Sequence, residues 1–289
     1  MMSLETSLAL QLPVIDFTSQ DLKPGTFEWD LVRDNVRRAL EEYGCFEALF
    51  DKVPVKHRKA VFDVSEEFFQ LSLETKERVV SEIKYKGYVG QNPTNPLYEG
   101  VGIEFSDNTE KVDAFTQKLW PKGNISFSET VLSFTEQVSE LDFVTRRMIM
   151  ESFWLEEKYI QEHLNSTKCL NSVADGIEVK TKDDKHWIKA NASQDSSFIV
   201  LGGSMLHVLL NGRVLSPVHR VTRIGTNTSY SAGLFAVPKT EDLIYAPEKV
   251  VDVDHPRLFK PVDFEGYFQF TTEESGRRDS KALMTYCGL

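Results

Sequence analysis

The spacing of apolar residues changes near Ser172, and this change constrains the fold more than any other feature of the sequence. Upstream, apolar side chains recur at helical spacing, most clearly in residues 28–43 and 127–163. Downstream, short segments alternate apolar and polar residues with a period of two, and turn residues separate them. The sequence therefore predicts an α+β chain whose C-terminal part is an antiparallel sandwich or barrel.

The same patterns predict individual elements. Expected helices cover residues 28–43, about 54–71, 127–163 with an interruption near Leu155, and 261–270. Expected strands cover residues 12–17, 45–50, 176–180, 187–189, 197–201, 205–210 and 230–237. Residues 82–108, rich in Gly, Asn and Pro, are expected to form a loop.

Composition narrows the class of protein. With 289 residues, of which 41% are hydrophobic, the chain can bury a full core in one or two domains. A net charge of -11 argues against binding to a nucleic-acid backbone. Residues 1–12 are too short and too polar for a signal peptide, and no apolar run approaches a membrane span, so we expect a cytoplasmic protein. The three cysteines form no CxxC pair, which favours reduced thiols.

Eight short blocks together resemble a known family. They are LPVIDF at 12–17, EYGCFEA at 42–48, GIEVKTK at 176–182, NGR at 211–213, SPVHRV at 216–221, SAGLF at 231–235, HPRLFKP at 255–261 and TYCG at 285–288. The family is that of the plant 2-oxoglutarate/Fe(II)-dependent dioxygenases, and within it the subgroup that produces alkenyl and hydroxyalkyl glucosinolates. The resemblance covers almost the whole chain.

The resemblance implies a helical N-terminal domain packed on a double-stranded β-helix, or jelly roll. It divides the chain into a non-haem dioxygenase N-terminal domain at 1–125, a scaffold helix and junction at 126–172, and the C-terminal part of the β-helix at 173–289. It also implies Fe(II) and 2-oxoglutarate as cofactors. The implied reaction is oxidative decarboxylation of 2-oxoglutarate to succinate and CO2, coupled to hydroxylation or desaturation of a small specialised metabolite.

The chain departs from the family at the metal site. Family members hold iron with two His and one carboxylate, two of which come from a His-x-Asp pair on an early strand. His219 matches the remaining histidine, but no His-x-Asp or His-x-Glu occurs anywhere in the sequence. Residues 164–168 pass almost directly into residues 170–173, where a few tens of family residues are missing. We therefore expect an incomplete β-helix with only one of its metal ligands.

The co-substrate site departs as well. The family's Arg-x-Ser pair binds the 2-oxoglutarate carboxylate, and here Ser229 stands in place of the arginine, with Tyr230 and Ser231 in register. Arg223 could offer its guanidinium to the same pocket if Ile224 pairs with Thr228. A shift of one residue in that register would turn Arg223 away, and a solvated strand-edge arginine is the preferred interpretation.

Other candidate ligands are weaker. His207 and His219 are each predicted on a strand, so both could face one cavity, although a hydrogen-bonded core histidine is the preferred interpretation of His207. Asp175 and Glu178 are the carboxylates nearest the missing segment. A turn position for Asp175 and a strand surface position for Glu178 are the simpler interpretations.

Two hypotheses follow, and both make the chain as written catalytically inactive. It is either a truncated, alternatively spliced or wrongly assembled product of an active oxygenase gene, or a pseudoenzyme that binds a metabolite or a protein partner. A missing His-x-Asp segment fits both hypotheses, whereas loss of the arginine at position 229 favours the pseudoenzyme. Exposed strand edges are also expected to promote self-association or aggregation.

Overall fold

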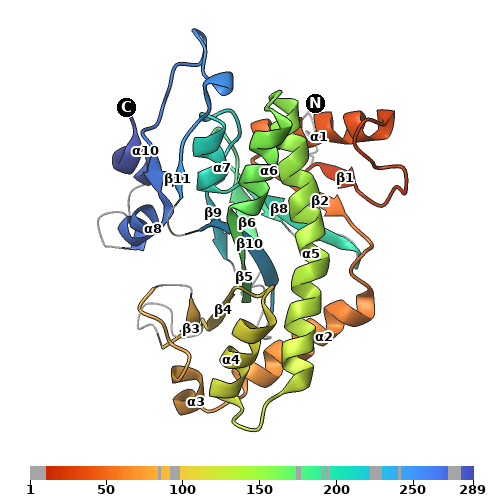
Figure 1. The fold of residues 1–289 in the computed structure, drawn as a ribbon, viewed down its shortest axis with the longest axis vertical. Coiled ribbons are helices and arrows are strands. Elements are labelled where there is room, and N and C mark those ends of the chain that lie inside the picture. Colours follow the sequence, from red (N-terminus) through yellow and green to blue (C-terminus); the bar gives the residue numbers. More distant parts are fainter. Residues whose placement is uncertain are drawn as a thin grey trace, which may run out of the picture.

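The computed structural model describes residues 11–83, 86–91, 98–173, 177–190, 192, 195–221, 230–239, 242–272 and 281–289. A 28-residue helix, α5 (Ile125–Ser152), runs through most of the length of the molecule, and α1 (Phe27–Glu42), α2 (Val55–Phe69) and α4 (Thr109–Leu119) pack against it. The sheets lie together beside this helical layer (Figure 1). The molecule is therefore α+β, as the change in periodicity predicts.

The first helix begins and ends where its sequence directs. The Thr26 hydroxyl accepts a hydrogen bond from the backbone N–H of Trp29, which caps α1. Gly44 follows the helix with a φ of +69°, a left-handed conformation that favours glycine. The chain then enters β2 (Cys45–Leu49), which lies parallel to β1 (Val14–Asp16). Both strands and α1 lie close to the predicted ranges.

The long helical segment is interrupted as predicted. Helix α5 ends at Ser152, and α6 (Glu157–Asn165) begins after a short turn in which Trp154 has a φ of +53°. The buried side chains of α5 recur at helical spacing and include Val131, Phe134, Val138 and Leu141. This stripe is the reason that the sequence pattern identifies the helix correctly.

Four sheets are formed by the described residues. The strands not yet given are β3 (Gly87–Val89), β4 (Gly100–Glu104), β5 (Thr167–Val173), β6 (Ile177–Lys180), β7 (Trp187–Ala190), β8 (Ser197–Leu201), β9 (His219–Val221), β10 (Ala232–Pro238), β11 (Leu243–Ile244) and β12 (Val262–Asp263). Their orders are β1-β2-β8, β10-β5-β4-β3, β7-β6-β9 and β11-β12. Strands β6, β7, β8 and β10 confirm four of the predicted strands.

The expected loop at residues 82–108 is wrong in part, because it contains β3 and β4. Glycine interrupts the apolar alternation of both strands, so the sequence pattern does not identify them as strands. Strand β4 pairs with β5, which lies far away in the sequence, so a tertiary contact stabilises a segment with weak local preference.

The expected strand at residues 205–210 is also wrong. The segment is helical, α7 (Ser204–Leu209), and it buries Val208 and Leu209 in the main core. Its nearly continuous run of apolar residues has no clear period of two, and such a run does not distinguish a strand from a buried helix.

The C-terminal segment closes the fold with short elements. These are a 3-10 turn η1 (Glu248–Val250), the strand pair β11-β12, and helices α8 (Phe264–Thr272) and α10 (Ala282–Cys287), with a further short helix α3 (Leu73–Glu77) in the N-terminal half. Helix α8 confirms the helix predicted at 261–270, displaced by a few residues. All three cysteines are free. In the part of the chain that the structure describes, no helix combines the length and apolarity needed to cross a membrane.

Burial of His163 at the end of α6 makes stability depend on pH. Burial, assisted by the charge of Arg146, lowers the pKa of His163 from 6.5 to about 4. The folded state therefore disfavours the protonated form of His163. The free energy of unfolding keeps its full value above pH 6.5 and decreases as the pH falls towards 4, because the unfolded chain then binds a proton that the folded chain does not. We expect the free energy of unfolding to fall by up to about 3 kcal/mol over this window, measured by urea melts at several pH values.

The matched variant His163→Gln should flatten that pH dependence. It should not abolish it, because burial also lowers the pKa of His207. An unchanged slope in His163→Gln would show that another group controls acid stability.

Candidate metal and co-substrate site

His219, the candidate metal ligand, lies on the inner face of the sheet β7-β6-β9. It is directly opposite Val179 of β6, and residues directly opposite in an antiparallel pair share a face. Val179 is 1% exposed and packs with Cys45 and Ala190 in a small apolar cluster between the sheets. The imidazole of His219 is nevertheless exposed, with Nδ1 3.2 Å from the carbonyl oxygen of Pro217.

The other face of this sheet carries Glu178, so that carboxylate points away from His219. Arg220 is opposite Glu178 and forms an ion pair with it at 2.7 Å. The same guanidinium lies over the ring of Trp187, 4.1 Å from its centroid. The contacts of Arg220 with Glu178 and Trp187 therefore lie on the outer face of the sheet. Glu178 is thus separated by the sheet from His219 on the inner face.

Tyr230 and Ser231, the candidate co-substrate residues, lie immediately before β10. The Tyr230 ring stacks on Phe69 of α2, with centroids 6.0 Å apart, so it is directed at the helical layer. Leu234 also packs on that layer, whereas Phe235 is 51% exposed on the opposite face. Extending the alternation of the strand puts Ser231 on the side of Phe235. Ser229, Arg223 and Asp175 lie outside the described residues.

His207 does not share a face with His219 in the way the sequence predicts, because its segment is a helix. Its Nδ1 donates a hydrogen bond to the carbonyl oxygen of Val214 at 2.5 Å, and its ring packs against Phe259 with centroids 5.4 Å apart. Burial lowers the pKa of His207, although the bond to Val214 opposes this. These contacts are those of a hydrogen-bonded core histidine, the preferred interpretation from sequence.

The described residues do not fit a facial triad. Among them, no group of three or more His, Cys, Asp or Glu side chains comes close enough to hold a metal ion. Fe(II) in this coordination needs two imidazoles and a carboxylate with open positions for the oxo-acid and oxygen. Of the candidate ligands that the structure describes, only His219 lies on the inner face of a β-helix sheet.

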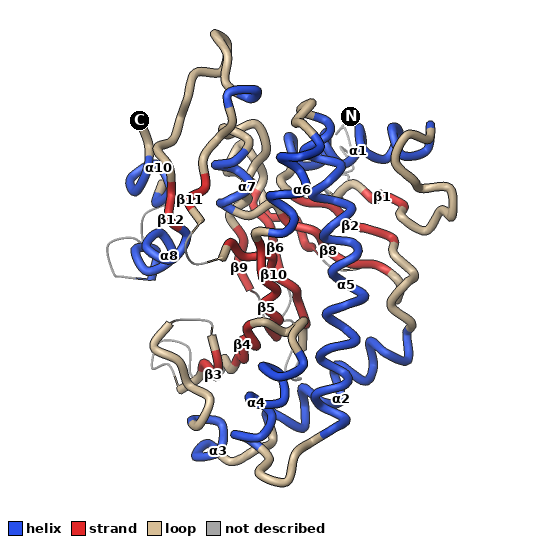
Figure 2. Tube along the Cα trace, viewed as in Figure 1, coloured by secondary structure: helices blue, strands red, loops and turns tan. Residues whose placement is uncertain are grey.

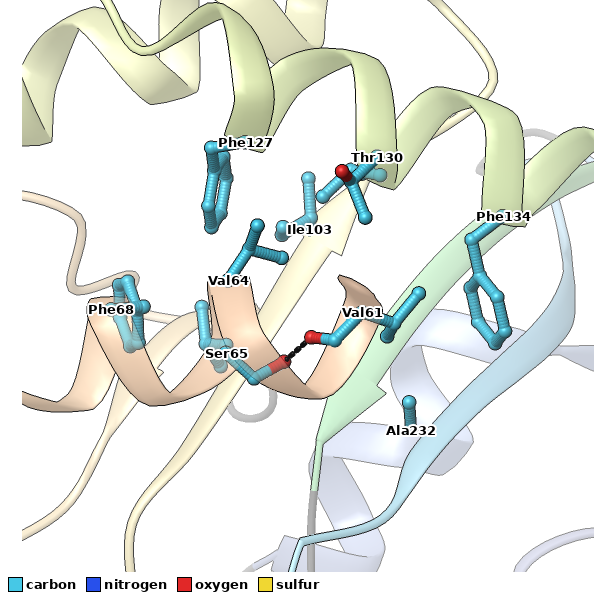
Figure 3. A pocket seen from close by; sticks show the side chains of 11 residues that line it. Val61, Val64, Ser65, Phe68, Ile103, Phe127, Thr130, Phe134 and Ala232 are labelled. Carbon is cyan, nitrogen blue, oxygen red and sulfur yellow. Dashed lines mark hydrogen bonds between the residues drawn. The ribbon is translucent and has the colours of Figure 1, made fainter. Parts of the chain in front are cut away.

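A cavity elsewhere in the molecule does not replace this site. It lies between α2, α5, β4 and β10, and Val64, Phe68, Ile103, Phe127 and Phe134 are among its lining residues (Figure 3). Its volume is about 30 Å³, whereas pockets for small molecules span about 300–1,000 Å³. The Ser65 hydroxyl donates to the carbonyl oxygen of Val61 within its own helix. The cavity is a packing defect of the core.

Sequence reasoning missed the strand formed at the shortened junction. Strand β5 pairs with β10 over seven residues, from Thr167 opposite Pro238 to Val173 opposite Ala232, and with β4 on its other edge. Its partner β4 falls in the predicted loop, so no pattern in the sequence could assign the pairing. The junction therefore lies at the centre of a four-stranded sheet.

The jelly roll is incomplete in its described strands. An eight-stranded jelly roll has two packed sheets, whereas six strands, β5 to β10, are described here. Strands β8 and β10 both pack residues on the main core, Phe198 and Val200 from β8 and Leu234 from β10, yet they belong to separate sheets. Within the described ranges, β8, β9 and β10 each have a strand partner on one edge alone.

Comparison with known proteins agrees with this architecture. The family described as non-haem dioxygenase in morphine synthesis N-terminal matches residues 12–123, and the 2OG-Fe(II) oxygenase superfamily matches residues 164–238. Two solved structures are similar: the rice dioxygenase for auxin oxidation (TM-score 0.79, 21% identity, 96% of this chain and 100% of that one) and JOX2 in complex with 2OG, Fe and JA (TM-score 0.77, 19% identity, 96% and 90%). Both show the fold, a double-stranded β-helix.

Sequence relatives match over almost their full length. The probable 2-oxoglutarate-dependent dioxygenase AOP1.2 of Arabidopsis thaliana is 45% identical over 320 residues, covering 98% of both chains. That alignment is longer than the 289 residues of this chain, so at least 31 of its positions lie opposite gaps in this chain. A protein named probable inactive 2-oxoglutarate-dependent dioxygenase AOP2, also from Arabidopsis thaliana, is 31% identical over 400 residues, covering 98% of this chain and 99% of that protein.

Proposed function

Because the chain belongs to the family of plant 2-oxoglutarate/Fe(II)-dependent dioxygenases, we propose that it is a catalytically impaired member of that family. Fe(II) and 2-oxoglutarate are the cofactors of the family. The ancestral reaction is the hydroxylation or desaturation of a small specialised metabolite, driven by oxidative decarboxylation of 2-oxoglutarate. The chain has kept the fold and one metal ligand but has lost turnover.

The missing metal ligands carry this proposal. The full sequence contains no His-x-Asp or His-x-Glu. In the described ranges no three ligating side chains converge, and Glu178 lies on the face opposite His219. A single imidazole leaves the family's Fe(II) site two ligands short.

The serine at position 229 supports the same proposal independently. A guanidinium can bind a carboxylate through two charge-assisted hydrogen bonds, and a hydroxyl offers one neutral donor. The substitution therefore weakens binding of 2-oxoglutarate even where iron is present. This change lies far along the sequence from the shortened junction, so one deletion does not explain both departures.

The second hypothesis is that the sequence is a shortened product of an active oxygenase gene. The gap of at least 31 positions relative to AOP1.2 is compatible with it, because splicing or a gene-model error can remove that many residues. A genomic exon that encodes a His-x-Asp strand between Lys168 and Asn171 would support this hypothesis. If no such exon exists, the pseudoenzyme, which binds a metabolite or a protein partner, is favoured.

The expected result of an anaerobic titration with Fe(II) and 2-oxoglutarate is the absence of metal-to-ligand charge-transfer absorption. In air, the chain should also release no succinate above a metal-free blank. The matched positive control is the 45% identical AOP1.2 protein, prepared and titrated in the same way. A charge-transfer band or succinate release from this chain would refute the proposal.

The resemblance to the family also underlies a proposed domain division and a proposed location in the cell. We place the N-terminal domain at 1–125, the scaffold helix and junction at 126–172, and the remainder of the β-helix at 173–289, in the cytoplasm. Limited proteolysis with mass spectrometry tests the division, since cuts should concentrate in exposed segments near the boundaries.

A further inference from the structure

Strand β10 forms one end of the sheet β10-β5-β4-β3. One edge of β10 pairs with β5 along all seven residues, and no described strand is hydrogen-bonded to its other edge. Figure 2 shows β10 among the strands, next to β5. An unpaired edge of this length presents a row of backbone donors and acceptors that can pair with another chain.

Three other strands at sheet ends, β3, β8 and β9, are less suited than β10 to pairing with their own copy. Its sequence, AGLFAVP, carries no charge, so two copies can lie side by side without like charges meeting. Strand β9 would place Arg220 near a second Arg220, and β3 has three residues and follows Lys86, which pairs with Glu104. Strand β8 is uncharged but has no exposed residue. Pro238 removes one donor at the last position of β10, and the six residues before it carry no feature that blocks pairing.

The centre of β10 also carries its most exposed side chain. Phe235 is 51% exposed and is the fourth of the seven residues of the strand, while Leu234 on the opposite face packs into the main core. An antiparallel pair related by a two-fold axis at the midpoint of β10 would place Phe235 opposite its own copy. Aromatic pairs across neighbouring strands stabilise a sheet.

We propose that β10 pairs antiparallel with β10 of a second copy of this chain, across a two-fold axis at Phe235. The two four-stranded sheets then join into one continuous sheet, and the symmetric contact closes at a dimer. This inference goes beyond the proposed loss of catalysis and holds whether or not the chain binds iron. A single ladder of this length is a small interface, so the dimer should dissociate in the micromolar range.

Light scattering coupled to size exclusion, from about 1 to 100 µM, measures the assembly. The intact chain should approach twice its mass of 33.0 kDa at high concentration, and Phe235→Lys should remain at 33.0 kDa throughout. The matched control is Leu243→Lys, because Leu243 is 56% exposed on β11 and lies outside the proposed contact. A monomer at all concentrations, open-ended oligomers, or a monomeric Leu243→Lys would overturn the proposal.

Cross-linking tests the two-fold register and does not depend on Phe235→Lys being folded. Phe235→Cys should form a covalent dimer under mild oxidation, because the axis brings the two introduced thiols together. Leu243→Cys should stay monomeric under the same conditions. Cys45 and Cys287 are buried, and the partly exposed Cys169 is replaced by Ser in both variants to remove background from native thiols. Equal cross-linking of the two variants would refute the register.

Discussion

Inserting the His-x-Asp segment of a relative between Lys168 and Asn171, together with Ser229→Arg, is expected to restore measurable succinate release. The insertion supplies the imidazole and carboxylate that His219 lacks, and the arginine restores a bidentate partner for the 2-oxoglutarate carboxylate. Ser229→Arg alone should give no turnover, because it adds no metal ligand. Succinate formation in air, with Fe(II) and 2-oxoglutarate supplied, measures the outcome.

The inserted segment must be accommodated without disrupting β5, because its insertion point lies inside that strand. Both edges of that strand are already hydrogen-bonded, to β10 and to β4. The matched control is an insert of the same length in which the His and Asp are replaced by Ala, since it tests the strands without the ligands. Activity in that control, or in Ser229→Arg alone, would mean that the metal site has been misidentified.

Asn211→Ala is expected to lower the free energy of unfolding by about 3 kcal/mol. The Asn211 side chain is buried, donates to the carbonyl oxygens of His255 and Pro256 at 3.1 Å, and accepts from the N–H of Leu258 at 2.9 Å. It also has a φ of +51°, where Asn is tolerated better than Ala. Alanine leaves three backbone groups without these partners in a conformation that it disfavours.

The matched control for this prediction is Asn108→Ala. Asn108 caps α4 by accepting one exposed hydrogen bond, from the N–H of Lys111, so its loss should cost about 1 kcal/mol. Urea-induced unfolding at pH 7 measures both variants. An Asn211→Ala protein no less stable than Asn108→Ala would show that the turn at 211–213 does not hold the segment at 255–258.

The sequence predicts elements whose preferences are local. Helix α1 is identifiable because the cap at Thr26, the buried stripe and Gly44 all agree, and β6 is identifiable because its alternation matches a half-buried strand. Helix α7 and strands β3 and β4 are not, because their assignment depends on distant partners. The absence of a His-x-Asp pair is a property of the sequence itself, whereas the opposed faces of Glu178 and His219 emerge only from the register of β6 with β9.

Strand β5 has a consequence for how the chain folds. Its Asn171 lies opposite Ile103 on one side and Leu234 on the other, each about 65 residues away along the chain. To form such distant contacts the chain must first close large loops, which costs conformational entropy before the contacts stabilise the sheet. During synthesis, β5 and β4 emerge well before β10, so this sheet stays one strand short until the ribosome has delivered the last fifth of the protein. The nascent chain is thus most vulnerable to misassembly at a late stage, when helices α1 to α7 have already been synthesised.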